Sequence, residues 1–195
     1  ADLLSRIGDR RILPSLVVLL SAQDPETRLA SVSVLEILGD AAVVPDILPL
    51  LEDPDDAVRL AGRHAVATLG GPQAVACLKT MLTRPESMVR LEAVLALRTL
   101  GDEAALRCAA SLLSDPDAEV RRTAVCALGG AGFRDLAPVI AERLSDPDLE
   151  TRLASLWVLV RLQASAEIPR IAKGLDAQAP EEQRLAAEAM ARILG

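Results

Sequence analysis

Small and apolar residues recur along the chain at the spacing of an amphipathic helix. In residues 118–132 this set is Val120, Ala124, Ala127 and Leu128, which fall within one arc when each residue is rotated by about 100° from the last. A stretch of this kind predicts a helix that packs one face against other helices.

The same helix recurs six times. Its arginine returns every 31 residues and then once after 32, as Arg28, Arg59, Arg90, Arg121, Arg152 and Arg184. Other residue types keep the same period: Gly8, Gly39, Gly70, Gly101 and Gly132, with Gln163 in the next slot, and Pro14, Pro45, Pro138 and Pro169. Self-similarity at a fixed period of this length is typical of solenoids, in which each repeat packs on its neighbours.

Each repeat predicts two helices, and residues 40–70 show the signals. Gly39 ends the preceding helix, and Asp40 can cap the first helix of the repeat. Asp53 and Pro54 predict the start of the second helix, because aspartate accepts from free N–H groups and proline suits the first helical position.

Two prolines disturb the first helix of this repeat. Pro45 and Pro49 lie inside it, where proline removes a backbone hydrogen bond. We therefore expect a kink or a late start in that helix.

The period divides the chain into one repeat domain. We predict an all-α fold, a right-handed α-α superhelix of about six two-helix repeats, at residues 9–39, 40–70, 71–101, 102–132, 133–163 and 164–195. Residues 1–8 match the tail of a second helix whose front half is missing. Because an open solenoid end exposes an apolar face, we expect the chain to be a fragment of a longer solenoid.

Composition narrows the possible partners and compartment. A hydrophobic share of 51% with one Trp, one Phe and no Tyr suits regular packing between helices. The net charge of −7 disfavours nucleic acid and anionic membrane surfaces, which both attract basic proteins. The apolar run at residues 16–20 is too short for a bilayer, which takes about 20 residues. Three cysteines without framework spacing predict reduced thiols and a cytoplasmic location.

These motifs resemble the HEAT-like repeats of the phycobilisome-lyase type. The resemblance covers essentially all of the chain and rests on Val58-Arg59, Val89-Arg90, Val120-Arg121, Ala65, Ala96, Ala127, Leu97 and Leu128. The sequence departs from the pattern at Thr27, Thr151, Gln183 and Arg84-Pro85. The resemblance implies a HEAT-like solenoid, but no single function, because such repeats occur in scaffolds, enzyme-associated subunits and regulatory domains.

One face of the second helices is more apolar than a solvated surface needs. Numbered from the recurring arginine as zero, positions +1, +5 and +8 lie opposite the packing face and would line the concave surface. Leucine fills five of the six +1 positions, Leu29, Leu60, Leu91, Leu153 and Leu185. We predict a partner-binding groove there, with the residues Leu60, His64, Leu91, Leu95, Arg98, Leu153, Trp157 and Val160. The open alternative is that tilted helices bury the leucines between repeats.

The fourth repeat interrupts this row. Its outward positions hold Arg122, Cys126 and Gly129 in place of large apolar side chains. We therefore expect the groove to be divided into two patches.

The recurring arginines are expected to hold neighbouring repeats together. A half-buried arginine on each second helix can bond an aspartate in a neighbouring inter-helix turn, such as Asp53, Asp115 or Asp146. We assign all six arginines to such a ladder, which would fix the angle between repeats. The alternative is a charged binding track.

We predict no catalytic residues, no metal site and no cofactor. His64 is the only histidine, so neither a Ser-His-Asp set nor a zinc site can be assembled. Cys77, Cys108 and Cys126 are expected to be packing residues. Residues 129–132 are rich in glycine but follow no strand, so phosphate binding is not expected.

The favoured function is a non-enzymatic scaffold that binds a partner protein or peptide in the groove. Trp157 is the strongest single candidate, because tryptophan is enriched in binding hot spots; the alternative is that it fills a gap between repeats. The resemblance implies a second function, a bilin lyase or isomerase-type subunit that acts on a tetrapyrrole-carrying protein. A third is a structural segment of a larger multidomain protein.

Overall fold

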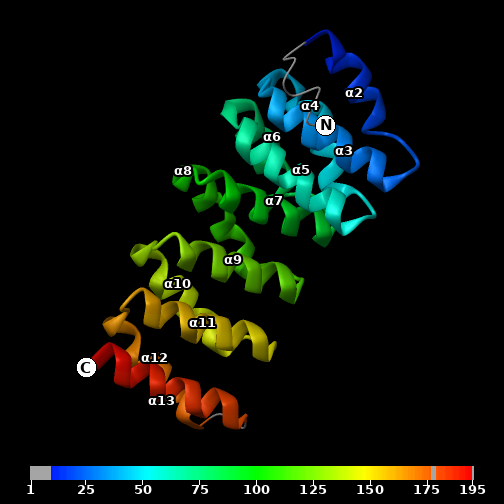
Figure 1. Ribbon diagram of the computed structural model, residues 1–195. Helices are drawn as coiled ribbons and strands as arrows, with labels where there is room; N and C mark the ends of the chain where they lie inside the picture. Colours follow the sequence, from blue (N-terminus) through cyan, green and yellow to red (C-terminus); the bar gives the residue numbers. More distant parts are fainter. Residues whose placement is uncertain (1–9, 177–178, 195) are drawn as a thin grey trace. The chain divides into compact units, whose positions relative to one another are not determined.

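The computed structural model describes residues 10–176 and 179–194, and every regular element within these ranges is a helix (Figure 1). The all-α prediction is therefore confirmed. The chain forms two compact units, Ala1–Ala105 and Leu106–Gly195. The truncated helix expected at residues 1–8 lies outside the described residues.

In the first unit, long second helices alternate with shorter first helices. The second helices are α3 (Pro25–Leu38), α5 (Asp56–Leu69) and α7 (Ser87–Leu100). The first helices are η1 (Arg10–Ile12) with α2 (Leu13–Leu19), the segment η2 (Ala41–Val43), α4 (Val44–Ile47) and η3 (Leu48–Glu52), and α6 (Gly71–Met81), where η marks a 3-10 helix. Helix α5 packs against both α3 and α7, as successive repeats require.

The second unit repeats this arrangement. Its second helices are α9 (Ala118–Gly130), α11 (Leu149–Arg161) and α13 (Pro180–Leu194), and α11 packs between the other two. Its first helices are η4 (Arg107–Ser114), the segment η5 (Arg134–Leu136), α10 (Ala137–Glu142) and η6 (Arg143–Ser145), and the segment η7 (Ser165–Glu167), α12 (Ile168–Ala172) and η8 (Lys173–Asp176). Helix α8 (Glu103–Leu106) lies at the boundary of the two units.

The prolines of the first helices produce the expected breaks. The segment with Pro45 and Pro49 changes from 3-10 to α and back to 3-10 geometry. By contrast α6, which has Ala76 and Thr80 in the same two slots, is one continuous α-helix. Proline is not the only cause, because η4 is a 3-10 helix with Arg107 in a proline slot.

Helices α5, α9 and α11 begin two residues later than their Asp-Pro motifs predict, whereas α3 begins at Pro25, directly after its cap Asp24. Asp55, not Asp53, caps α5 by accepting from the N–H groups of Ala57 and Val58. Asp53 accepts from the N–H of Asp55, and its carboxylate also binds an arginine of the preceding repeat. In this repeat the Asp-Pro motif therefore forms the turn that precedes the helix, and the helix itself begins after the motif.

The core is built from the small and apolar positions of each second helix. Val120, Ala124, Ala127 and Leu128 on α9 are all buried, as predicted, and Ala131 is half-buried. Such small side chains let neighbouring helices approach closely, which explains why the chain needs so few aromatics.

The missing glycine of the fifth repeat leaves a strained residue. Gly39 and Gly101 end α3 and α7 in the left-handed conformation that glycine adopts freely. Gln163 occupies the equivalent slot with φ of 53° and is the one non-glycine residue with positive φ in the described part of the chain. A side chain in this conformation costs roughly 1–2 kcal/mol.

Replacing Gln163 with glycine is expected to raise the free energy of unfolding by about 0.5–1 kcal/mol. The relief of strain exceeds the extra entropy that glycine gains in the unfolded chain. Gly101→Gln is the matched reciprocal variant, because nothing lies within 4 Å of a Cβ at Gly101 and only its φ of 74° opposes the change. Denaturant titration should show opposite signs for the two variants, and equal signs would contradict the strain argument.

Candidate functional site

Five of the recurring arginines are tied to the turn that precedes their own helix. In each, Nη1 donates to one or two carbonyl oxygens five or six residues earlier in the chain. Arg121, for example, reaches the carbonyls of Asp115 and Pro116 at 2.8 and 3.1 Å. The five are Arg28, Arg59, Arg90, Arg121 and Arg152.

Arg28 and Arg121 also form buried ion pairs with an aspartate of the next repeat. Arg28 donates from Nε and Nη2 to Asp53 at 2.7 and 2.6 Å, and Arg121 donates in the same way to Asp146 at 2.8 and 2.7 Å. Because 25 residues separate the partners in both cases, each pair joins a second helix to the following inter-helix turn.

The ion pairs shift the pKa values of their members. Burial alone would raise the pKa of Asp53 and of Asp146. The hydrogen bonds from the arginine and from a backbone N–H, with the arginine's positive charge, outweigh burial and lower both values. The hydrogen bond to aspartate raises the pKa of Arg28 and of Arg121. All four groups are therefore held in their charged forms.

Where the aspartate is missing, a glutamate from the next second helix lies against the arginine. Arg84, and not an aspartate, stands 25 residues after Arg59. In its place the buried Glu92 on α7 brings its carboxylate to 3.5 Å from Arg59 Nε. In the second unit, Glu182 on α13 accepts from Arg152 Nε at 2.9 Å. The two glutamates come from outside the Asp-Pro motif, so the motif could not predict them.

Arg184 does not share this arrangement. Its side chain is 78% exposed, and the carboxylate it approaches among the described residues is that of Glu188, on its own helix, at 4.0 Å. Arg184 is therefore not placed as we expected for a residue of the ladder, because its side chain is open to solvent on α13.

The outward positions +1, +5 and +8 of the second helices, here called the second-helix face, are partly accessible in the first unit. Leu60 is 46% exposed, and His64 and Arg98 are exposed as well. Leu91 and Leu95 are half-buried. The leucines are thus neither fully exposed nor fully buried between repeats.

In the second unit the second-helix face centres on Trp157. Its side chain is 49% exposed on α11, and Leu153 and Val160 beside it are half-buried. Each unit therefore carries part of the predicted set.

Gly129 does not face outward as its helical position suggests. It is buried, and a Cβ built on it would lie within 3.0 Å of Cβ and both γ-methyl carbons of Val158. The glycine therefore permits α9 and α11 to approach closely at this point. A projection of one helix cannot show this, because burial here depends on the size of a side chain in the next repeat.

A small pocket lies beside Trp157, between α11 and α13. Its volume is about 180 Å³. The lining residues follow helical spacing on both helices: Trp157, Val160, Arg161, Leu185, Glu188, Ala189 and Arg192. Arg161 was not predicted, since it lies at position +9; its guanidinium carbon is 5.6 Å from the centroid of the Trp157 ring.

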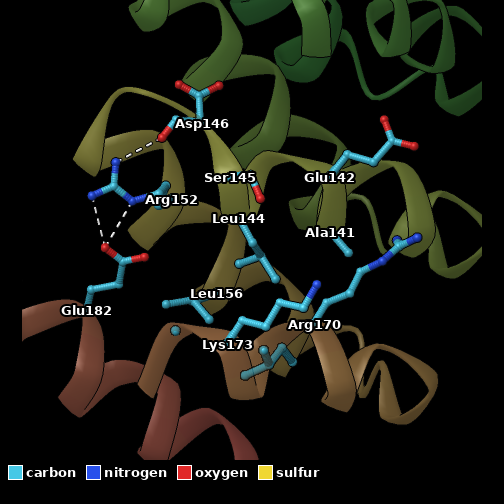
Figure 2. Close-up of a pocket in the computed structure, with 12 residues that line it drawn as sticks. Ala141, Glu142, Leu144, Ser145, Asp146, Arg152, Leu156, Arg170, Lys173 and Glu182 are labelled. Atoms are coloured by element: carbon cyan, nitrogen blue, oxygen red, sulfur yellow. Dashed lines mark hydrogen bonds and ion pairs between the residues drawn. The ribbon is translucent and has the colours of Figure 1, made fainter. Parts of the chain in front are cut away.

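A larger cavity of about 690 Å³ lies between the first helices of the last two repeats (Figure 2). Leu144, Leu156 and Ile171 give it apolar surface. The Arg152–Glu182 pair stands at one end, and Figure 2 shows Arg170 and Lys173 on the side away from it. The sequence pattern did not identify this cavity, because Arg170 and Lys173 lie on a first helix and do not recur with the period.

The remaining candidates are dispersed. Cys77 and Cys126 are half-buried, whereas Cys108 is exposed and so differs from the packing role expected for it. Among residues 10–176 and 179–194, no three His, Cys, Asp or Glu side chains are grouped as a metal site would need. None of the described helices is both long and apolar enough to cross a membrane.

Comparison with known proteins identifies the repeat. A family model for HEAT repeats matches three overlapping stretches, residues 1–67, 44–115 and 106–191. No curated protein sequence matches the chain at a significant level.

Several solved structures share the fold. An engineered protein is 21% identical with a TM-score of 0.57, over 93% of this chain and 96% of that one. The complex of CpcE and CpcF of phycocyanin lyase from Nostoc sp. PCC7120 is 22% identical with a TM-score of 0.54, over 90% and 74%. Human deoxyhypusine hydroxylase in complex with glycerol is 22% identical with a TM-score of 0.52, over 98% and 76%. At these identities the likeness shows the fold alone.

Proposed function

Because the chain belongs to the HEAT-repeat family, we propose that it is a non-enzymatic scaffold that binds a partner protein or peptide on its second-helix face. Repeat proteins of this kind present extended surfaces to their partners. The observation that carries the proposal is that Leu60 and Trp157 are each about half exposed at outward positions of this face. Exposed large apolar side chains that adjoin half-buried ones are typical of interaction sites.

The charged side chains of the fold favour a binding role over catalysis by the recurring arginines. Arg28 and Arg121 are buried and already bonded to aspartates, so their guanidinium groups are not available to a substrate. The accessible residues of the face combine the apolar Leu60 and Trp157 with the polar His64, Arg98 and Arg192. A peptide or a protein helix offers the complementary apolar and polar groups.

Replacing Leu60 and Trp157 together by serine is expected to weaken partner binding at least roughly tenfold, since hot-spot side chains dominate binding energy. A random peptide library selected on the whole chain provides the ligands. Each selected peptide is then titrated against wild type and the variant, with circular dichroism to check that helicity is unchanged.

The matched control is the double variant Val18→Ser and Val139→Ser. These side chains are also exposed, one lies in each unit, and both belong to first helices. Binding should survive in this control. If every selected peptide binds the Leu60/Trp157 variant as well as wild type, the second-helix face is not the binding surface.

A bilin lyase-type role on a tetrapyrrole-carrying protein is the second candidate. The cavity of about 690 Å³ is within the range of small-molecule sites, roughly 300–1,000 Å³. Arg170 and Lys173 could pair there with the carboxylates of a linear tetrapyrrole. An absorbance change when bilin is mixed with the chain, lost on Lys173→Glu, would favour this role over the scaffold.

We propose that the chain acts in the cytoplasm, where its cysteines would stay reduced. If it is instead a structural segment of a larger multidomain protein, other parts of that protein would occupy the second-helix face. Such parts added as separate polypeptides should then compete with the selected peptides.

A further inference from the structure

We infer that the pocket beside Trp157 receives one large apolar side chain from an acidic peptide segment of the partner. The inference rests on the proposed function and names the chemistry of the partner at one place on the second-helix face.

The size of the pocket limits its occupant. Its volume of about 180 Å³ is well below the roughly 300–1,000 Å³ of sites for cofactors and drug-sized ligands. A single leucine, methionine or phenylalanine side chain is an occupant of suitable size. Of its lining residues, Trp157 is accessible, whereas Ala189 is buried.

The walls of the pocket are apolar where such a side chain would lie. Val160 and Trp157 face it from α11, and Leu185 and Ala189 face it from α13. An indole ring provides a large and rigid contact surface, which is why tryptophan is enriched at the centre of binding sites.

The charges at the rim of the pocket favour a negatively charged segment of the partner. Arg161 and Arg192 line the pocket, are exposed, and have no carboxylate within ion-pairing distance among the described residues. Arg161 donates a hydrogen bond to the carbonyl oxygen of Gly130, at 3.3 Å. The lining contains one acid, Glu188, against these two arginines, and its carboxylate lies 4.0 Å from Arg184.

This rim is therefore locally basic in a chain whose net charge is −7. Two guanidinium groups that lack carboxylates, on either side of an apolar pocket, are complementary to aspartate or glutamate flanking an apolar residue. A neutral or basic peptide would leave both cations uncompensated.

The test uses peptides selected from a random library on the whole chain. First, the peptides that need Trp157 are identified by their loss of binding to Trp157→Ser, which should be about 10-fold or more. We expect these peptides to carry a large apolar residue with acidic residues close to it. Because Trp157 is the only tryptophan, its fluorescence should shift on binding.

Charge reversal then tests the rim. The double variant Arg161→Glu and Arg192→Glu should lower the affinity for these peptides by roughly 10-fold or more. Added salt should lower their affinity for the wild-type chain. Arg134→Glu is the matched control, since Arg134 is exposed and does not line the pocket, and it should leave binding unchanged.

The outcomes separate this inference from the function on which it rests. Trp157-dependent peptides without acidic residues, or indifferent to the double charge reversal, would overturn the inference and leave the scaffold proposal intact. If no selected peptide depends on Leu60 or Trp157, the scaffold proposal fails and the inference fails with it.

Discussion

Replacing Asp146 with asparagine is expected to lower the free energy of unfolding by about 3 kcal/mol, because it leaves a buried guanidinium without its carboxylate. The side chains of Arg121 and Asp146 are only 9% and 1% exposed. An asparagine has one acceptor oxygen and would turn a donor NH₂ toward Arg121. Thermal denaturation should show a midpoint lower by roughly 6–12 °C for a chain of this size.

Asp135→Asn is the matched control, since it makes the same chemical change in a solvated ion pair. Asp135 pairs with Arg107, and both side chains are exposed. Exposed pairs contribute about 0–1 kcal/mol, so this variant should stay close to wild type. Equal losses in the two variants would show that burial of the Arg121–Asp146 pair is not the cause.

The same pair predicts how Asp146→Asn responds to acid. The pKa of Asp146 in the folded chain is below its ordinary value of 3.8, because the hydrogen bonds and charge of Arg121 outweigh burial. Above pH 3.8 the carboxylate is ionised in both states, and the pair contributes fully. Below that pH the unfolded chain binds the proton first, so the contribution is lost as the pH falls through the folded pKa. The stability difference between wild type and variant should therefore be largest near neutral pH and shrink in strong acid.

The repeat period was enough to predict the architecture. Arg28 and Arg121 each have an aspartate 25 residues later, in the turn that the period places beside them. Prolines likewise marked where a first helix would break. These features depend on local chemistry that several repeats share, so a consensus can describe them.

The departures from the period could not be predicted in the same way. Glu182 accepts a hydrogen bond from Arg152, although Glu182 does not belong to an Asp-Pro motif that would predict this contact. Arg161 lies at the pocket beside Trp157 from a position that the outward set omits. Both depend on the shape of a gap between two particular repeats, which no single helix contains.

Replacing Gly129 with alanine is expected to destabilise the second unit by up to about 2 kcal/mol. Overpacking of a tight contact costs about 1–3 kcal/mol, and here the added carbon meets the branched end of Val158, which cannot rotate away. The gain in helix propensity, about 1 kcal/mol, offsets part of the cost. Denaturant titration of the whole chain measures the difference.

Gly130→Ala makes the same change one residue later, where nothing lies within 4 Å of the new carbon. It should be neutral or stabilise by up to about 1 kcal/mol, because only the propensity gain remains. In the double variant of Gly129→Ala with Val158→Ala, the γ-methyl groups that block the new carbon are gone. The stability lost in the double variant should therefore be smaller than the sum of the losses in the two single variants, by about 1 kcal/mol or more. Strict additivity would mean that Gly129 does not set the approach of α9 and α11, and that its burial has another cause.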